Sequence, residues 1–143
     1  MTGDSSGAFS TFLHSINELE RHPEVRRAIE QQLDRTMDQA YILRSLLRFE
    51  SDNIDRAAHS PSQFRQYVEE KVRGTRALIP EIGNLLDLIE DCIEAEILGG
   101  ERVIRIQRQL RHIYQLHRHL PEMSPEDVDR LSDQISSLYE LVS

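Results

Sequence analysis

The sequence predicts an all-α fold, an antiparallel helical bundle of five to six helices. Apolar residues recur every three or four positions along nearly the whole chain, which is the spacing of one helix face. Prolines stand where helices are expected to begin or end. No stretch alternates β-branched or aromatic residues with polar ones, so a sheet is not expected. Helices joined by short turns usually pack as antiparallel bundles.

The length of 143 residues fits one domain. Residues 1–7 are small and polar and predict a flexible N-terminal arm, which leaves 8–143 as a single helical-bundle domain. A first helical face then runs to the His22-Pro23 step, where the helix is expected to end. Its apolar positions are Phe9, Phe12, Leu13, Ile16 and Leu19.

The second predicted helix spans Pro23 to Glu50 and has a heptad-like seam. The seam positions are Ile29, Leu33, Thr36, Ala40, Leu43 and Leu47. Further apolar residues widen this stripe, as is typical of a helix packed among several others. Residues 51–60 are polar and predict a linker.

Ser60-Pro61 predicts the next helix start, with Ser60 as the cap and Pro61 in the first turn. Pro80 either ends this helix or kinks it. The apolar pattern resumes after Pro80 and continues to Gly99-Gly100, a predicted C-cap and turn.

A further helix is predicted over 101–120, ended by Pro121. Ser124-Pro125 predicts the start of the last helix, with acids in its first turn to match the helix dipole. Its apolar positions step by three and four and are Val128, Leu131, Ile135, Leu138 and Val142.

Charges are sorted by segment, although the net charge is −8. Residues 76–98 and 121–143 each hold one arginine and six acids, whereas 99–120 holds five arginines and one acid. One basic helix therefore lies between two acidic helices in the sequence. Flanking acids would repel phosphates, so broad nucleic-acid binding is not expected.

Two interpretations of the basic helix stay open. Its arginines either pair with acidic neighbours across helix interfaces or contact an anionic partner outside the chain. The candidate partner-binding residues are Arg105, Arg108, Arg111, His112 and Arg118. The acidic strip of Asp87, Glu90, Asp91 and Glu94 similarly fits a solvated face or a basic partner.

Common catalytic and metal-binding patterns are missing from the sequence. No glutamate is followed by histidine three residues later, and neither a phosphate-binding glycine loop nor a nucleophile elbow is present. His14, Glu18 and His22 could share a face, but no fourth ligand is identifiable. Cys92 lies among apolar residues and predicts an inert buried thiol. We expect no cofactor and no metal site.

One pattern supports an alternative function. Arg111 is followed by His112 and, after five intervening residues, by His117. Histidine can transfer protons and arginine can stabilise a charged transition state, so such a pair can cleave RNA without metal. This spacing resembles the motif of the HEPN family of small all-helical RNases. The resemblance implies a ribonuclease or toxin with Arg111 and His117 catalytic, His112 supporting and the site at a dimer interface.

The preferred hypothesis is a non-catalytic helical protein–protein interaction module, such as a small regulator, adaptor or assembly subunit. Its partner would be another protein or a second copy of the chain, with RNA a partner only under the alternative. The N-terminus lacks the pattern of a secretory signal and no run is apolar enough for a membrane span, so a cytoplasmic protein is expected. Several apolar residues lie off the seams and either form an exposed patch or contact other helices. They are Ile42, Leu46, Phe49, Leu88 and Leu116.

Overall fold

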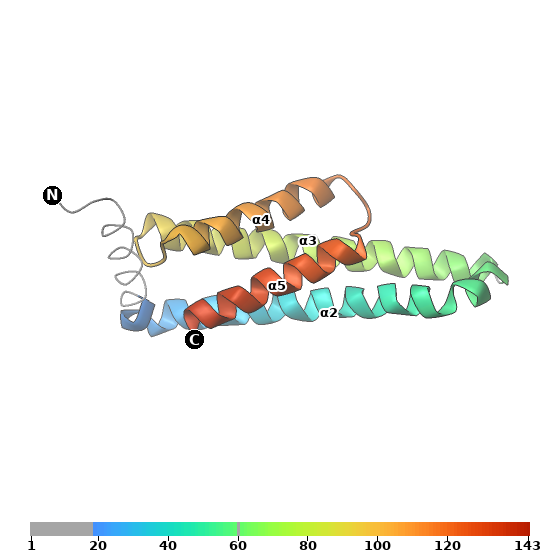
Figure 1. The fold of residues 1–143 in the computed structure, drawn as a ribbon, viewed down its shortest axis with the longest axis horizontal. Helices are drawn as coiled ribbons and strands as arrows, with labels where there is room; N and C mark the ends of the chain where they lie inside the picture. Colours follow the sequence, from blue (N-terminus) through green and yellow to red (C-terminus); the bar gives the residue numbers. More distant parts are fainter. Residues whose placement is uncertain (1–18, 60) are drawn as a thin grey trace.

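The structure, a computed structural model, describes residues 19–59 and 61–143, and for 49–59 it describes the backbone alone. The arm predicted over 1–7 and most of the first predicted helix lie outside these residues. The described chain contains helices α2 (Pro23–His59), α3 (Pro61–Glu94), α4 (Glu101–Arg118) and α5 (Pro125–Val142) (Figure 1). The all-helical prediction is confirmed for the described residues, which contain no strand. None of these helices is sufficiently long and apolar to span a membrane.

Each of the four helices packs mainly against two others. The principal contacts are α2 with α3 and α5, and α4 with the same two helices. Gln32 on α2 donates from Nε2 to the Glu81 carbonyl on α3 at 3.1 Å, whereas Leu43, further along α2, lies near Gly74, which is earlier on α3. The chain therefore turns back between α2 and α3, and this hairpin extends past α4 and α5 at its closed end (Figure 1).

The core follows the predicted seams closely. All six seam residues of α2 are buried, and so are the five predicted apolar positions of α5. Thr36 is the polar member of the α2 seam. Its hydroxyl donates to the Gln32 carbonyl at 2.8 Å, so its burial leaves no unsatisfied donor.

The predicted start of the last helix is confirmed in detail. The Ser124 hydroxyl accepts from the Asp127 amide at 3.2 Å, and the Asp127 carboxylate accepts from the Ser124 amide at 3.4 Å. This reciprocal capping box satisfies two backbone donors at the helix end. Pro125 occupies the first turn, where its missing N–H costs nothing.

The predicted linker over 51–60 is wrong, because α2 continues as a helix to His59. This stretch contains neither glycine nor proline, and Arg56, Ala57 and Ala58 are good helix formers. The polar residues before them lower helix propensity by only a few tenths of a kcal/mol each, which does not end a helix already under way.

Helix α3 continues through Pro80 and ends before the glycine pair. Pro80 has no N–H to donate to the Arg76 carbonyl, yet the fully buried Leu78 and Ile82 on either side hold the helix against its neighbours. The helix then ends at Glu94, and Glu96 takes the left-handed conformation with φ of 60°. The predicted turn at Gly99-Gly100 therefore only completes a connection that a non-glycine residue begins.

We expect Pro80→Ala to raise the free energy of unfolding by about 1–3 kcal/mol, because the new amide can donate to the Arg76 carbonyl. Pro23→Ala is the matched control, since Pro23 opens α2 and replaces no helical hydrogen bond. Urea unfolding followed by circular dichroism measures both variants. Equal stabilities of Pro80→Ala and Pro23→Ala would contradict the expectation.

Candidate functional site

Helix α4 holds the candidate residues, and three of its five arginines form ion pairs within the chain. Arg111 pairs with Glu90 on α3. Arg102 lies 3.4 Å from Glu140 on α5, and Arg105 lies 3.2 Å from Glu101 on α4 itself. The first two pairs match the interpretation that the basic helix complements its acidic neighbours. The Arg105 pair is highly exposed and contributes little stability.

The remaining basic side chains of α4 lie on its exposed surface. Arg108 and Arg118 form no ion pair with any described residue, and both are exposed. Arg105, Arg108, His112 and Leu116 are spaced three or four apart and all are exposed, so they form one outward face of α4. Arg118 lies on a different side, beside α3, where it lines a pocket with Arg76.

The structure does not bring Arg111 and His117 together. Arg111 is exposed and bound to Glu90 on α3, whereas His117 is 4% exposed and bound to Asp127 on α5. Both side chains are therefore engaged with different helices. His112, the supporting residue of the RNase alternative, is exposed on the outward face.

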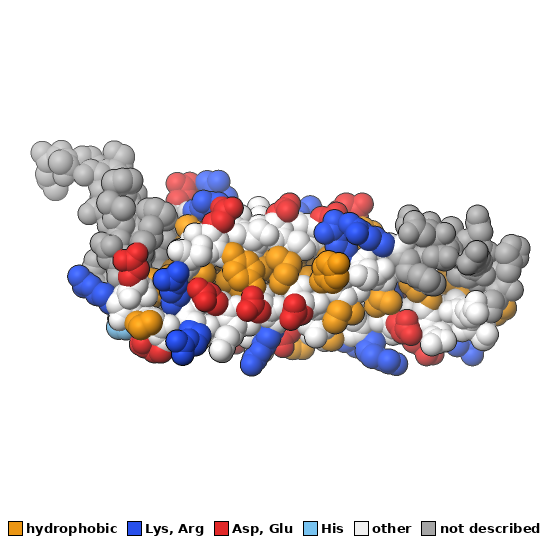
Figure 2. Space-filling model, turned by 90° about the horizontal axis from the view of Figure 1, so that it is seen from below, with side chains coloured by type: hydrophobic (Ala, Val, Ile, Leu, Met, Phe, Trp, Pro, Cys, Tyr) orange, Lys and Arg blue, Asp and Glu red, His pale blue; other side chains and the backbone are white. Residues whose placement is uncertain are grey.

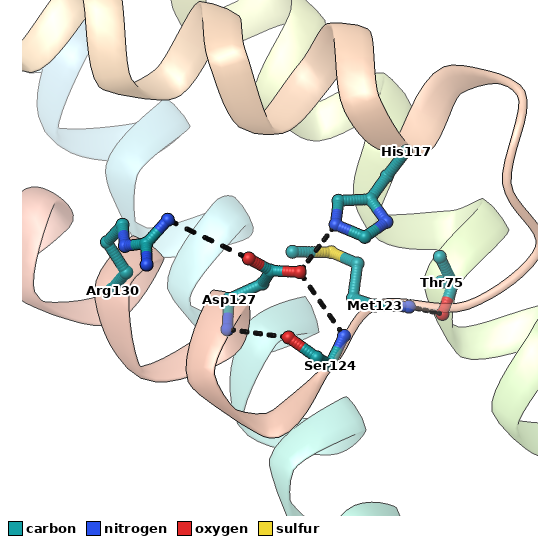
Figure 3. A network of polar contacts seen from close by, with 6 residues as sticks. All are labelled: Thr75, His117, Met123, Ser124, Asp127 and Arg130. Atoms are coloured by element: carbon teal, nitrogen blue, oxygen red, sulfur yellow. Dashed lines mark hydrogen bonds and ion pairs between the residues drawn. The ribbon is translucent and has the colours of Figure 1, made fainter.

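The main cluster that sequence reasoning missed is the buried pair of His117 and Asp127 (Figure 3). The His117 Nε2 lies 2.6 Å from the Asp127 Oδ2, and the two side chains are 4% and 13% exposed. His117 comes from the last turn of α4 and Asp127 from the first turn of α5. The pair thus joins the two helices just where the chain turns between them.

Asp127 is held in its ionised form by the groups around it. Burial alone would raise its pKa, but hydrogen bonds from Ser124 and His117 outweigh this and lower the pKa of the carboxyl. Arg130 lies 3.9 Å from the other carboxylate oxygen. An ionised Asp127 accepts a hydrogen bond, so the His117 Nε2 carries the proton and donates it.

The other ring nitrogen of His117, Nδ1, has no partner in the described part of the chain. Nδ1 is buried and forms no hydrogen bond with any described residue. In Figure 3 it lies on the edge of the ring turned away from Asp127 and toward Thr75. The Thr75 hydroxyl is already engaged, because it donates to the Lys71 carbonyl at 3.1 Å and accepts from the Met123 amide at 3.3 Å. Buried nitrogens without partners are uncommon in proteins and call for an explanation.

The lowered pKa of Asp127 predicts a loss of stability in acid. A carboxyl whose pKa is lower in the folded state stabilises the protein above its unfolded pKa of about 3.9, and this contribution disappears as the pH falls through the folded value. We expect the free energy of unfolding of Asp127→Asn to depend less on pH below about 4 than that of the parent protein. Urea titrations at several pH values measure the difference. Parallel pH profiles would contradict the expectation.

The other chemistry candidates take no part in this cluster. Cys92 is buried, as predicted, and burial together with the nearby Asp91 raises the pKa of its thiol. His14 and Glu18 lie outside the described residues, and His22 is 3.5 Å from Glu24. Within the residues that the structure describes, no three His, Cys, Asp or Glu side chains are placed to hold a metal ion.

Apolar side chains reach the surface in several places. Figure 2 shows the side of α2 and α5, where hydrophobic side chains are interspersed with acidic and basic ones. Of the residues predicted off the seams, Ile42 and Leu116 are exposed, Leu46 and Leu88 are half-buried, and the Phe49 side chain is not described. Tyr41 is the most exposed large hydrophobic residue in the described part of the chain, at 67%.

No protein-family model, curated protein or solved structure matches this chain. The resemblance to the HEPN family therefore rests on the local spacing of Arg111 and His117.

Proposed function

We propose that this chain is a non-catalytic interaction module, an antiparallel bundle of five to six helices that binds an acidic protein partner through the outward face of α4. Regulators, adaptors and assembly subunits act in this way. The outward face comprises Arg105, Arg108, His112 and Leu116.

The observation that supports this proposal is the exposed positive charge on that face, which the neighbouring Glu101 offsets only in part. Arg108 has no ion pair among the described residues, and the pair of Arg105 with Glu101 is exposed on both sides. These cations remain available to an acidic surface on a partner. They would speed the encounter with that partner and favour it over partners of other charge. Leu116 is 45% exposed at the end of the face and supplies an apolar contact beside the charges.

A second copy of this chain also offers acidic groups. Asp87, Asp91 and Glu94 on α3 are exposed, and a partner's α4 could bind there. Such a contact joins two different surfaces, so it would build chains of molecules or closed rings rather than a simple two-fold dimer. Light scattering separates self-association from binding to another protein.

The test exposes three immobilised proteins to the same native lysate. They are the parent, a double variant of α4 (Arg105→Glu and Arg108→Glu) and a double variant of α2 (Arg27→Glu and Arg35→Glu). The last is a matched control, because it makes the same charge change at two exposed arginines of α2. We expect an acidic protein to be retained by the parent and the control and lost from the α4 variant. Retention should also weaken with salt, because salt screens charges. Equal thermal melts show that all three proteins are folded.

Retention that is equal in all three proteins, or absent from the parent, contradicts this proposal. Retention that disappears after nuclease treatment favours the RNA-binding alternative instead. Cleavage of RNA by the parent without metal, lost in Arg111→Ala and His117→Ala, would replace the proposal with the HEPN-like ribonuclease.

A further inference from the structure

A pocket of about 410 Å³ lies between the middle of α3, the end of α4 and the connection to α5. Its volume is in the range of small-molecule sites. Its walls come from α3 on one side and from the end of α4 with the following residues on the other. The lining residues are Thr75, Arg76, Ile79, Pro80, His117, Arg118, His119, Leu120 and Pro121.

The packing of α3 and α4 explains where this pocket lies. At Gly83 the two helices are very close, since a Cβ added there would lie 3.1 Å from the Tyr114 ring. One turn further toward the pocket, the Pro80 ring replaces an N–H and leaves the Arg76 carbonyl without its helical donor. The pocket therefore begins where the close contact ends and the helix has an irregular turn.

The charge of the lining is positive. Arg76 and Arg118 are exposed, and neither forms an ion pair with a described residue. Among the described residues no carboxylate lines the pocket, and the lining also includes His119. Glu122, in the connection that follows, is 3.1 Å from Lys71 and so has its own partner. A cation would be repelled from this pocket, whereas an anion would be attracted.

His117 adds a buried polar group to this lining. Its side chain is only 4% exposed, and its Nδ1 has no hydrogen-bond partner among the described residues. Asp127 holds the ring through Nε2, and the free edge of the ring is on the side of Thr75, another lining residue (Figure 3). A carboxylate behind an imidazole fixes the ring and stabilises it when both nitrogens carry protons. In that form Nδ1 is a donor in need of an acceptor.

We propose that this pocket binds a small phosphate-bearing ligand through Arg76, Arg118 and the His117 Nδ1. Planar guanidinium groups suit phosphate oxygens, and a bound phosphate would favour a second proton on the ring, at Nδ1, and accept a hydrogen bond from it. Ile79, Pro80 and Leu120 give apolar walls for a ring or short chain attached to the phosphate. This site lies on another side of α4 from Arg105 and Arg108, so it is independent of the partner-binding proposal.

Titration calorimetry with inorganic phosphate and phenyl phosphate tests the site. We expect both to bind the parent protein, and Arg76→Ala and Arg118→Ala each to weaken binding about tenfold or more. Arg65→Ala is the matched control, because Arg65 is an exposed arginine of α3 outside the pocket. It should bind as the parent does. Benzoate, with a carboxylate on the same ring, should bind at least about tenfold more weakly than phenyl phosphate.

Nitrogen NMR of the labelled protein tests the role of His117 without a substitution in the core. Phenyl phosphate should shift the Nδ1 signal of His117 toward the protonated form and leave that of the exposed His112 unchanged. The proposal would be overturned if the parent bound no phosphate, or if Arg76→Ala and Arg118→Ala bound it as well as the parent. Equal binding of benzoate and phenyl phosphate, or an unchanged His117 signal, would also overturn it.

Discussion

Asp127→Ala is expected to lower the free energy of unfolding by about 3 kcal/mol or more. The substitution removes one member of a buried pair and leaves neither nitrogen of the His117 ring bonded to a described residue, since Nδ1 has no partner among them already. It also removes half of the capping box with Ser124. For a chain of this size the melting temperature should fall by about 10 °C.

Asp129→Ala is the matched control for this experiment. Asp129 is also an aspartate of α5, but its ion pair with Arg44 is exposed and 3.6 Å long, so its loss should cost about 1 kcal/mol at most. Calorimetry and urea unfolding measure both variants. A double-mutant cycle of His117→Ala with Asp127→Ala should give a coupling energy of about 1–3 kcal/mol. Additive single effects would show that the two side chains do not depend on each other.

Leu110→Ala should destabilise the protein by about 2–5 kcal/mol. Leu110 is 0% exposed on α4, the helix that packs against both α3 and α5. Truncation removes the transfer free energy of the lost atoms and leaves a cavity that helices packed on both sides cannot fill completely. Equilibrium urea unfolding gives the free energy directly.

Leu116→Ala provides the control on the same helix. The substitution is identical, but Leu116 is 45% exposed, so the expected change is within about 0.5 kcal/mol. Similar losses in the two variants would mean that the α4 seam is not where the structure has it. Leu116→Ala should also weaken the partner contact while leaving stability unchanged, which separates binding from folding at one residue.

The periodic helix faces could be predicted from the sequence, whereas the residues at which the helices end were harder to predict. The seam from Ile29 to Leu47 and the cap at Ser124 depend on local spacing and local hydrogen bonds, which the sequence displays directly. Helix α2 continues to His59 because residues 51–59 contain no helix breaker, although their polar character suggested a linker. The continuation of α3 through Pro80 depends instead on the packing of the buried Leu78 and Ile82 against other helices. Such tertiary contacts override local propensity and do not appear in a single stretch of sequence.

The candidate site shows the same division. One of the two interpretations of the charge sorting was that arginines of α4 pair with acidic neighbours, and the structure pairs Arg111 and Arg102 with acids on the adjacent helices. The partner of His117 was not identified, although the residue lies in the core direction of α4 and Asp127 opens the next helix. A histidine on an apolar seam followed by an acid at the next helix start was the available signal. The distance between them depends on how the connecting turn folds back.

Because Asp127 lies on the last helix, the support of the His117 ring depends on the packing of α5. His117 belongs to α4, but the Asp127 carboxylate that holds its ring belongs to α5 and reaches the ring only when α5 packs against α4. The Tyr139 hydroxyl on α5 likewise bonds to Asp34 on α2, a helix far earlier in the sequence. A fluctuation that detaches α5 from the other helices therefore releases the His117 imidazole and exposes the face of α2 in one cooperative step. The pocket beside His117 is lined by α3, the end of α4 and the connection that follows, so detachment of α5 would remove the support of its histidine rather than its walls.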